Sequence, residues 1–355
     1  MKYKYGFAVC IGRFQPFHKA HQELVKHALT LAEKVILVLG SARSAPDIRN
    51  PWTPAMREEM IRACFPNENE RLIFRAVRDY PYNDNFWIAE VQNSVSEAIL
   101  DNSDLDNPED ALVALVGHFK DRTSYYLNLF PQWSFEDFWR SSADLQKTHA
   151  ASLREEFFQI EAENSWKNRV PNEVLKFLER YQQSEIFAEL LHEFDYIRKY
   201  KADTRFVGVP FDPVFVTTDA VVVQSGHILV VRRKFHPGKG LLALPGGFLL
   251  SGMTLEDSAL RELKEETNIH VPPQILKQSI KASHIFDYPD RSQRGRTITQ
   301  AFFIQLEASL KNGLPQVKGG DDAARAFWLP LSSLGEMEEQ FFEDHIHIIR
   351  YFLGL

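Results

Sequence analysis

The chain has 355 residues, of which 44% are hydrophobic and 25% are charged, and its formal net charge is −7. These values are typical of a globular protein and exclude the basic surface that general nucleic-acid binding requires. The length favours two domains over one. The sequence has no apolar tract long enough to span a membrane and no signal-type apolar region after Met1. We therefore expect a cytoplasmic protein with neither membrane nor nucleic-acid partners.

The two cysteines, Cys10 and Cys64, are too few for a disulfide framework or a structural zinc site. Both lie among apolar residues, so we predict buried free thiols. The sequence leaves the oligomeric state open, and a homo-oligomer is one alternative.

The string Gly12 to His21, which reads GRFQPFHKAH, follows the apolar run Phe7 to Ile11. It predicts a strand, a loop and the start of a helix. A glycine permits close backbone approach, Arg13 supplies positive charge, and a helix start favours an anion. His18 and His21 are three residues apart, on one face of the first turn. The string predicts a phosphate site, although a plain strand-loop-helix with two surface histidines would look similar.

Apolar and helical segments alternate from Phe7 to about Val116. The predicted strands are 7–11, 35–39, 72–74 and 111–116. The predicted helices are 22–32, 54–64 and 87–100. This order indicates an α/β fold with a Rossmann-like parallel sheet and helices on both faces. In such sheets ligands bind beyond the carboxyl ends of the strands.

Polar loops follow the second and third predicted strands. Residues 40–53 carry two arginines, and Thr53 followed by Pro54 predicts a helix N-cap. The loop is either a long connection or a functional segment. The string from Tyr82 to Trp87 follows the third strand, and a tryptophan at a helix start is either a core anchor or a platform for a ligand.

Two further strings complete the first half of the chain. Gly117 to Tyr126 follows the fourth predicted strand, and Lys120 within it is either a phosphate ligand or a solvated side chain. The string Ser152-Leu153-Arg154-Glu155 has the form of a capping box and predicts a helix N-terminus at Ser152. Such an N-terminus can hold a phosphate and place Arg154 against it.

Together these strings resemble the nucleotidylyltransferase superfamily, and closely the archaeal-like nicotinamide mononucleotide adenylyltransferases. His18-Lys19-Ala20-His21 resembles the family's H-x-G-H signature, with Ala20 in place of the usual Gly. An alanine is tolerated there if the residue is already helical. The resemblance implies that ATP binds to Gly12, Arg13, Phe14, His18, His21, Gly117, Lys120 and Arg154. His18, His21, Lys120 and Arg154 are then catalytic.

The same resemblance implies that Arg49, Asn83 and Trp87 bind nicotinamide mononucleotide. The arginine grips the phosphate, the amide binds the carboxamide and the indole stacks on the pyridinium ring. Another acceptor, such as phosphopantetheine, is disfavoured because a flexible thiol chain has no use for a stacking platform.

The second half of the chain begins after a helical stretch, residues 171–201. We assign residues 1–200 to the adenylyltransferase domain, 201–212 to a linker that contains Gly208 and Pro210, and 213–355 to a second domain. Strands at 214–223 and 228–232, joined by Gln224-Ser225-Gly226-His227, predict a hairpin.

Glu262, Glu265 and Glu266 are spaced so that all three lie on one face of a helix, which Thr254 can cap. A bound divalent cation would reverse their mutual repulsion. With the preceding Gly246-Gly247 pair, the string resembles the Nudix box. Met253 stands where that pattern has Glu, and Asn268 stands where it has Gly, a mild change because Asn tolerates left-handed geometry.

The Nudix resemblance implies an α/β/α sandwich with a mixed sheet, and an ADP-ribose pyrophosphatase. Gly246, Glu262, Glu265 and Glu266 would bind Mg²⁺, with Mn²⁺ as a substitute, and Glu262 and Glu266 would be catalytic. Residues 284–287 and 294–297 are expected to precede a strand at 301–306. Arg294 and Arg296 would bind ADP-ribose. Residues 318–323 form a Gly-rich acidic loop that we expect to be flexible. It either brings Asp321 or Asp322 to a metal-bound water as the base or is a plain turn.

The leading hypothesis is therefore a bifunctional enzyme of NAD metabolism. One half would transfer AMP from ATP to nicotinamide mononucleotide, and the other would hydrolyse ADP-ribose. The alternative, raised by Met253, is that the Nudix half binds nucleotides as a sensor without turnover or acts on a different nucleoside diphosphate.

Overall fold

The computed structural model describes residues 3–119, 122–138, 149–159, 165–203, 212–308, 313–320 and 322–355. The chain forms two compact units, Met1–Leu191 and His192–Leu355. Within the described residues, every helix is too short or too polar to cross a membrane. Lys120, Asp321 and most of the predicted linker lie outside the described residues.

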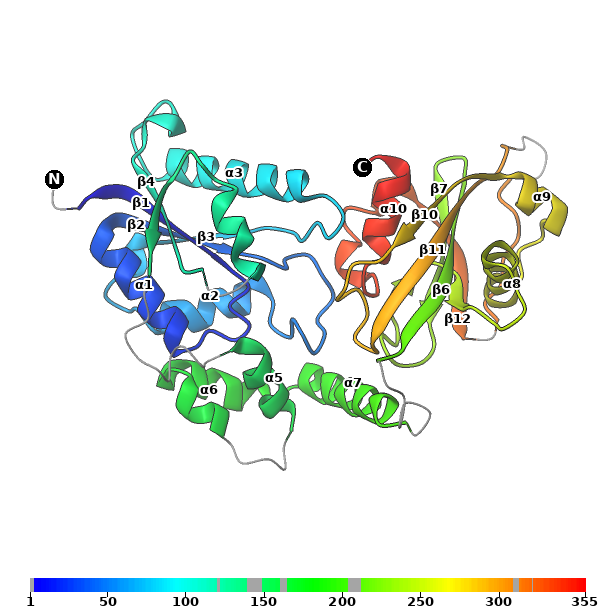
Figure 1. The fold of residues 1–355 in the computed structure, drawn as a ribbon, viewed down its shortest axis with the longest axis horizontal. Coiled ribbons are helices and arrows are strands. Elements are labelled where there is room, and N and C mark those ends of the chain that lie inside the picture. The colour runs from blue at the N-terminus through cyan, green and yellow to red at the C-terminus, as the bar shows by residue number, and fades with distance from the viewer. Residues whose placement is uncertain are drawn as a thin grey trace. The chain divides into compact units, whose positions relative to one another are not determined.

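The first unit is built on a five-stranded sheet whose order is β3-β2-β1-β4-β5, with every neighbouring pair parallel (Figure 1). Its strands are β1 (Tyr5–Gly12), β2 (Ala32–Leu39), β3 (Leu72–Ala76), β4 (Val113–Gly117) and β5 (Ser134–Asp137). Its helices are α1 (Lys19–Leu31), α2 (Pro54–Ala63), α3 (Asp84–Asp101), α5 (Ala150–Phe158), α6 (Asn172–Tyr181) and α7 (Glu185–Lys201), which continues into the second unit. The predicted parallel sheet is confirmed. β5 was not predicted because it is short and mostly exposed.

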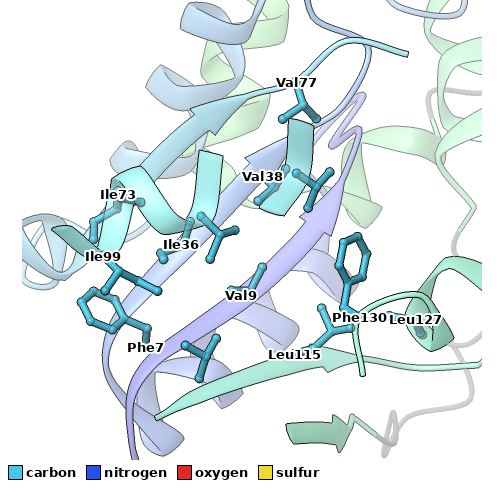
Figure 2. Close-up of a cluster of buried hydrophobic side chains, with 14 residues drawn as sticks. Phe7, Val9, Ile36, Val38, Ile73, Val77, Ile99, Leu115, Leu127 and Phe130 are labelled. Atoms are coloured by element: carbon cyan, nitrogen blue, oxygen red, sulfur yellow. The ribbon is translucent and has the colours of Figure 1, made fainter. Parts of the chain in front are cut away.

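The two faces of this sheet bury alternate residues of each strand, as period-two geometry requires. On one face, Phe7 and Val9 of β1 pack in one cluster with Val91 and Val95 of α3 (Figure 2). The intervening Cys10 is fully buried on the other face, and burial raises the pKa of its thiol to about 12. The strands thereby become the rigid support for the polar loops at their carboxyl ends.

Several helix boundaries agree with the sequence and others do not. The Thr53 side chain accepts the Met56 N–H as the predicted N-cap of α2. The predicted capping box at Ser152 is wrong, because α5 already begins at Ala150 and the Ser152 hydroxyl donates to the His149 carbonyl. The long helical stretch is two helices, α6 and α7. Cys64 is only partly buried, in contrast to the expectation.

The second unit has a seven-stranded mixed sheet. Its main path is β10-β11-β6-β7-β12, in which only β11 and β6 are parallel; β8 pairs with β7, and β9 with β6. The strands are β6 (Val214–Gln224), β7 (His227–Arg233), β8 (Leu242–Ala243), β9 (Gly246–Phe248), β10 (Ile280–Phe286), β11 (Arg296–Gln305) and β12 (Ala323–Pro330). The helices are α8 (Leu255–Thr267), α9 (Pro273–Gln278) and α10 (His345–Leu353).

Helices cover both faces of this sheet, which confirms the predicted sandwich. Leu263 of α8 packs with Ala220 and Ile304 on one face. On the other, Phe352 of α10 stacks on Phe303, with ring centroids 5.7 Å apart. Residues 284–286, expected to precede a strand, are themselves the end of β10, whose apolar and polar residues were too mixed to predict it.

The predicted hairpin between β6 and β7 is confirmed. Ser225 and Gly226 both have positive φ, 47° and 72°, which is the backbone of the two-residue turns that match strand twist. Asn268 ends α8 in the left-handed conformation, as its place in the Nudix pattern suggests.

Candidate active sites

The two histidines of the first motif lie at the start of α1. His18 is the N-cap, and its backbone N–H donates to His21 Nδ1 at 3.4 Å. The two imidazole rings are stacked with centroids 3.6 Å apart, as their spacing predicts. His18 is buried and His21 is partly buried beside Phe14. Ala20 is inside α1 and buried, so no glycine is needed there. The pair places ring nitrogens where the helix dipole is positive.

Three arginines from distant parts of the sequence gather near this helix start. Arg154 of α5 is buried and donates to the Gln15 carbonyl. Burial, and then the positive charges of Arg13 and Arg49, lower the pKa of Arg154 to about 10. Arginines that repel one another at short range create a local positive potential. This cluster is suited to an anion with several charges.

The loop that carries Arg49 is held at its C-terminal end. Its Trp52 exchanges two hydrogen bonds with the Gln15 side chain, at 2.9 and 3.1 Å, and the Tyr181 hydroxyl donates to the Pro51 carbonyl at 2.9 Å. Within the loop, the partly buried Asp47 carboxylate accepts the Arg49 N–H at 2.9 Å. The long polar loop is therefore ordered by hydrogen bonds that fix the backbone at Arg49.

Asn83 and Trp87 stand at the start of α3, as predicted. The Asn83 side-chain oxygen accepts the Phe86 N–H, which leaves its amide N–H₂ group as a donor. Trp87 is partly buried against the cluster of Figure 2, with tilted or edge contacts to Tyr126 and Phe130 at 6.1 and 5.8 Å. The indole is thus anchored in the core, and neither of these neighbours stacks face to face upon it.

The glycines of the first site have packing reasons for being glycine. A β-carbon on Gly117 would lie 2.6 Å from Leu127 Cδ2, and one on Gly12 would lie 3.1 Å from the Phe14 ring. Phe14 itself has a positive φ of 52°. These positions shape the loops, whatever they bind.

In the second unit, Glu262, Glu265 and Glu266 lie along α8. Glu266 is buried and its carboxylate accepts the Gly246 N–H at 3.1 Å. Glu262 and Glu265 both receive hydrogen bonds from Arg261. Burial, with added repulsion from Glu262, raises the pKa of Glu266 to about 8. The carboxylates are thus held in place by backbone and by one arginine.

The Gly246-Gly247 pair lets the main chain approach these acids closely. A β-carbon on Gly246 would lie 2.4 Å from Asp219 Oδ1, and one on Gly247 would lie 2.5 Å from Glu262 Oε1. β9 pairs with β6 so that Gly246 stands opposite Asp219. Any other residue would displace a carboxylate. This explains the two glycines by close approach.

The residues present fit a divalent cation. In the described part of the chain no three acidic, His or Cys side chains already converge as a closed metal site. The candidate ligands are nevertheless the glutamate carboxylates of α8 and the Gly246 carbonyl. Such oxygen atoms are the ligands that hard divalent cations prefer. The repulsion between Glu262 and Glu266, seen in the raised pKa, is what such a cation relieves. Gly246, Glu262 and Glu266 are the closest group, and Glu265 is the more exposed.

The two predicted ADP-ribose ligands differ in their surroundings. The Arg294 guanidinium lies over the Phe248 ring, 5.2 Å from its centroid. Arg296, the first residue of β11, instead donates to the Asp287 carbonyl. Arg233, which the sequence analysis did not single out, lies close enough to Glu266 and Arg294 for their charges to influence its pKa, which burial lowers.

The Gly-rich acidic loop is not free, in contrast to the expectation. The Lys318 and Gly320 N–H groups donate to the carbonyls of Thr267 and Glu266, at 2.8 and 3.0 Å. A β-carbon on Gly320 would lie 2.6 Å from the Glu265 carbonyl. These glycines permit close docking on the end of α8. Asp322 follows this docked segment, and its carbonyl accepts the Lys234 N–H.

Sequence reasoning missed residues that hold these sites together. Asp219 is buried and accepts the Thr299 hydroxyl at 2.6 Å; a lone acid inside the apolar run of β6 was the available signal. His345 accepts the Leu244 N–H just before the glycine pair, and nothing in its local sequence indicates this. Gln15 is another such residue, because its partner is 37 positions away.

Comparison with known proteins agrees with two domains. Residues 9–100 match the cytidylyltransferase-like family, and residues 214–352 match the NUDIX domain. The chain is 35% identical to a nicotinamide/nicotinic acid mononucleotide adenylyltransferase of Acinetobacter baylyi over 54% of this chain and 95% of that one. It is 31% identical to an ADP-ribose pyrophosphatase of Methanocaldococcus jannaschii over 39% of this chain and 72% of that one.

The likeness to solved structures extends over the whole chain, as one of them illustrates. It is a bifunctional NMN adenylyltransferase/ADP ribose pyrophosphatase from Francisella tularensis, complexed with AMP and a Mn ion. It is 32% identical, covers 99% of both chains and has a TM-score of 0.86. Both halves and their order are therefore shared. The chain belongs to the family of bifunctional NMN adenylyltransferase/ADP ribose pyrophosphatases.

Proposed function

We propose that residues 1–200 transfer AMP from ATP to nicotinamide mononucleotide, and that residues 213–355, after a linker at 201–212, hydrolyse ADP-ribose. The observation that carries the first activity is the cluster of Arg13, Arg49 and Arg154 beside the stacked histidines. The observation that carries the second is the approach of Glu262 and Glu266 to the glycine pair.

The transfer needs no general base. A phosphate oxygen of the mononucleotide attacks the α-phosphorus of ATP, the bond from that phosphorus to the β-phosphate bridging oxygen breaks, and NAD and pyrophosphate form. Because the attacking phosphate is already an anion near neutral pH, positioning and charge stabilisation supply the catalysis. We assign the triphosphate to His18, His21 and Arg154, with Gly12, Arg13, Phe14, Gly117 and Lys120 completing its site.

The acceptor is assigned to the two loops after β2 and β3. Arg49 would bind the mononucleotide phosphate through its fork of donors, and the free N–H₂ of Asn83 would donate to the carboxamide oxygen. Trp87 would offer its exposed part to the pyridinium ring. A single N–H donor such as that of Asn83 can bind the oxygen of a carboxamide or of a carboxylate equally well. Nicotinic acid mononucleotide is therefore the second acceptor to test.

Hydrolysis places water on a phosphorus of the ADP-ribose diphosphate. The P–O–P bridge breaks, AMP and ribose 5-phosphate leave, and the water proton passes to a base, for which Asp321 and Asp322 are the candidates. Mg²⁺, or Mn²⁺ in its place, when bound by Gly246, Glu262, Glu265 and Glu266, supplies positive charge to the diphosphate and its attacking water. We assign Arg294 and Arg296 to ADP-ribose.

A second candidate for this half is a nucleotide sensor without turnover. Met253 favours it, because this position carries Glu in the Nudix pattern. Met253 lies in the loop before α8, partly exposed, and its N–H donates to the Leu250 carbonyl. A neutral side chain there leaves the metal site with less negative charge.

One set of incubations tests both activities. The purified chain is given ATP, Mg²⁺ and either nicotinamide or nicotinic acid mononucleotide, and separately ADP-ribose with Mg²⁺ or Mn²⁺. We expect NAD and pyrophosphate in the first case, and AMP with ribose 5-phosphate in the second. Tight ADP-ribose binding without AMP release at any metal concentration would favour the sensor. If neither acceptor yields a dinucleotide, the proposed adenylyl transfer is refuted.

A further inference from the structure

Arg57 of α2 is fully buried, with 0% of its surface exposed, which is rare for arginine. Its guanidinium Nη1 donates to the Arg13 carbonyl at 2.7 Å and to the Gly40 carbonyl at 2.6 Å. Nη2 reaches the Ser41 carbonyl at 3.5 Å, and Nε donates to the Thr53 carbonyl of its own helix start at 3.4 Å. One planar fork therefore holds the loop after β1 and the loop after β2 together.

The residues that follow two of these carbonyls have unusual backbones. Phe14 and Ser41 both have a positive φ of 52°, and neither is glycine. Such conformations persist only where the surroundings impose them. In a trans peptide the N–H points opposite to the C=O. The hydrogen bonds from Arg57 to the carbonyls of Arg13 and Gly40 therefore also set the direction of the N–H groups of Phe14 and Ser41. Arg57 thus fixes the course of both loops.

Other contacts hold the same two loops in place. The Gly40 N–H donates to the Gly12 carbonyl at 3.0 Å, and the Asp79 carboxylate accepts both the N–H and the hydroxyl of Ser41. These bonds close around the carbonyls that Arg57 holds. The loops are therefore one unit in which the guanidinium is the central, multiply bonded member.

We propose that Arg57 is a positioning residue for adenylyl transfer, which holds the loop carrying Arg13 and the loop leading to Arg49 in one fixed relation. The inference rests on the proposed function, in which the first loop meets ATP and the second meets the mononucleotide phosphate. Attack on the α-phosphorus requires both substrates to be aligned, and a shift of about 1 Å costs about 100-fold in rate. Lysine cannot replace the residue, because a single ammonium does not reproduce a planar group that donates to four carbonyls.

The test compares Arg57→Lys and Arg57→Met with Arg62→Met in the full-length chain. Arg62 is on the same helix, but it is half-exposed, is paired with Glu58 at 2.8 Å and touches neither loop. We expect Arg57→Lys to lower kcat for adenylyl transfer about 100-fold while the KM for each substrate stays within about threefold. ADP-ribose hydrolysis by the same samples serves as the internal control. A merely structural role predicts a lower melting temperature with kcat per folded molecule unchanged.

Hydrogen exchange supplies a readout that does not depend on the reaction. The N–H groups of Gly40, Ser41 and Ala42 are all hydrogen-bonded, to the Gly12 carbonyl, the Asp79 carboxylate and the Val77 carbonyl. We expect Arg57→Met to speed their exchange at least about tenfold, and Arg62→Met to leave it unchanged. If the wild type makes no dinucleotide, the proposed function fails and exchange alone decides the role of Arg57. Unchanged exchange, or an Arg57→Lys kcat within about twofold of wild type, overturns the proposal.

Discussion

The two candidate sites carry opposite charges. In the first, arginines and histidines stand at the carboxyl ends of parallel strands and can meet an anion directly. In the second, the acids on α8 would need a cation between themselves and a diphosphate. A chain with a net charge of −7 contains both arrangements, so the overall charge says little about how a particular site binds.

The two sites also differ in how they are assembled. The acids of the second unit come from one helix, with spacings of three and four residues. The arginines and histidines of the first unit come from four separate segments, which are the loops after β1 and β2, the start of α1 and the helix α5. A helix can be recognised from its own sequence, whereas a cluster of loops needs the whole sheet to bring it together. The following substitutions test whether the sites are separate and differ in charge as described.

The largest expected effect is that of Glu266→Gln on ADP-ribose hydrolysis. The variant keeps an oxygen for the Gly246 N–H but loses the negative charge. We expect a loss above about 1,000-fold, because even an outer partner of a metal site is worth about 10–100-fold. The measurement is AMP release, with Glu265→Gln, which alters a more exposed acid, as the milder control. Undiminished hydrolysis by Glu266→Gln would show that the acids of α8 take no part in the reaction.

His18→Ala should lower adenylyl transfer by about 100- to 1,000-fold, since a donor to the developing charge is lost. ADP-ribose hydrolysis should stay within about twofold, because the acids act in the other unit. Initial rates of both reactions on one preparation check this. His27→Ala, on the same helix but near Phe138, is the matched control. Equal loss of both activities in a folded variant would contradict two separate sites.

Trp87→Ala should raise the KM for nicotinamide mononucleotide by up to about 30-fold and leave that for ATP nearly unchanged. The range corresponds to a cation–π contact of about 0.5–2 kcal/mol. Trp133→Ala is the control, because Trp133 stacks on Phe130 in the same cluster, with centroids 4.7 Å apart. If both variants weaken both substrates alike, Trp87 acts through packing and the stacking role is wrong.

Met253→Glu should give the smallest change, a decrease of up to about tenfold in the Mg²⁺ concentration for half-maximal hydrolysis. The added carboxylate supplies negative charge in the loop before α8. Met253 is partly exposed, so the fold should tolerate the change. Titrations with Mg²⁺ on wild type, Met253→Glu and Met253→Gln separate charge from size. An identical response of all three would show that this position does not influence the metal.

The sequence alone determined the fold class and the order of the two domains. The alternation of β1 to β4 with α1 to α3, the turn at Ser225-Gly226 and the spacing of the acids on α8 depend on residues close together in the chain. The cap at Thr53 and the left-handed Asn268 were likewise local, and both are as predicted. Local patterns also misled, because Ser152 has the form of a cap but lies two residues after the first residue of the helix.

Only the tertiary structure decided what holds the sites. Arg154 reaches the carbonyl of Gln15 across 139 positions, and Leu244 is held by His345 across 101. The expected flexible loop at 318–320 is docked on the end of α8 by hydrogen bonds to residues about 50 positions earlier. Periodicity records which face of an element is buried, but it carries no information about which distant carbonyl a buried donor will find. Those partners are fixed only when the sheet has brought the loops together.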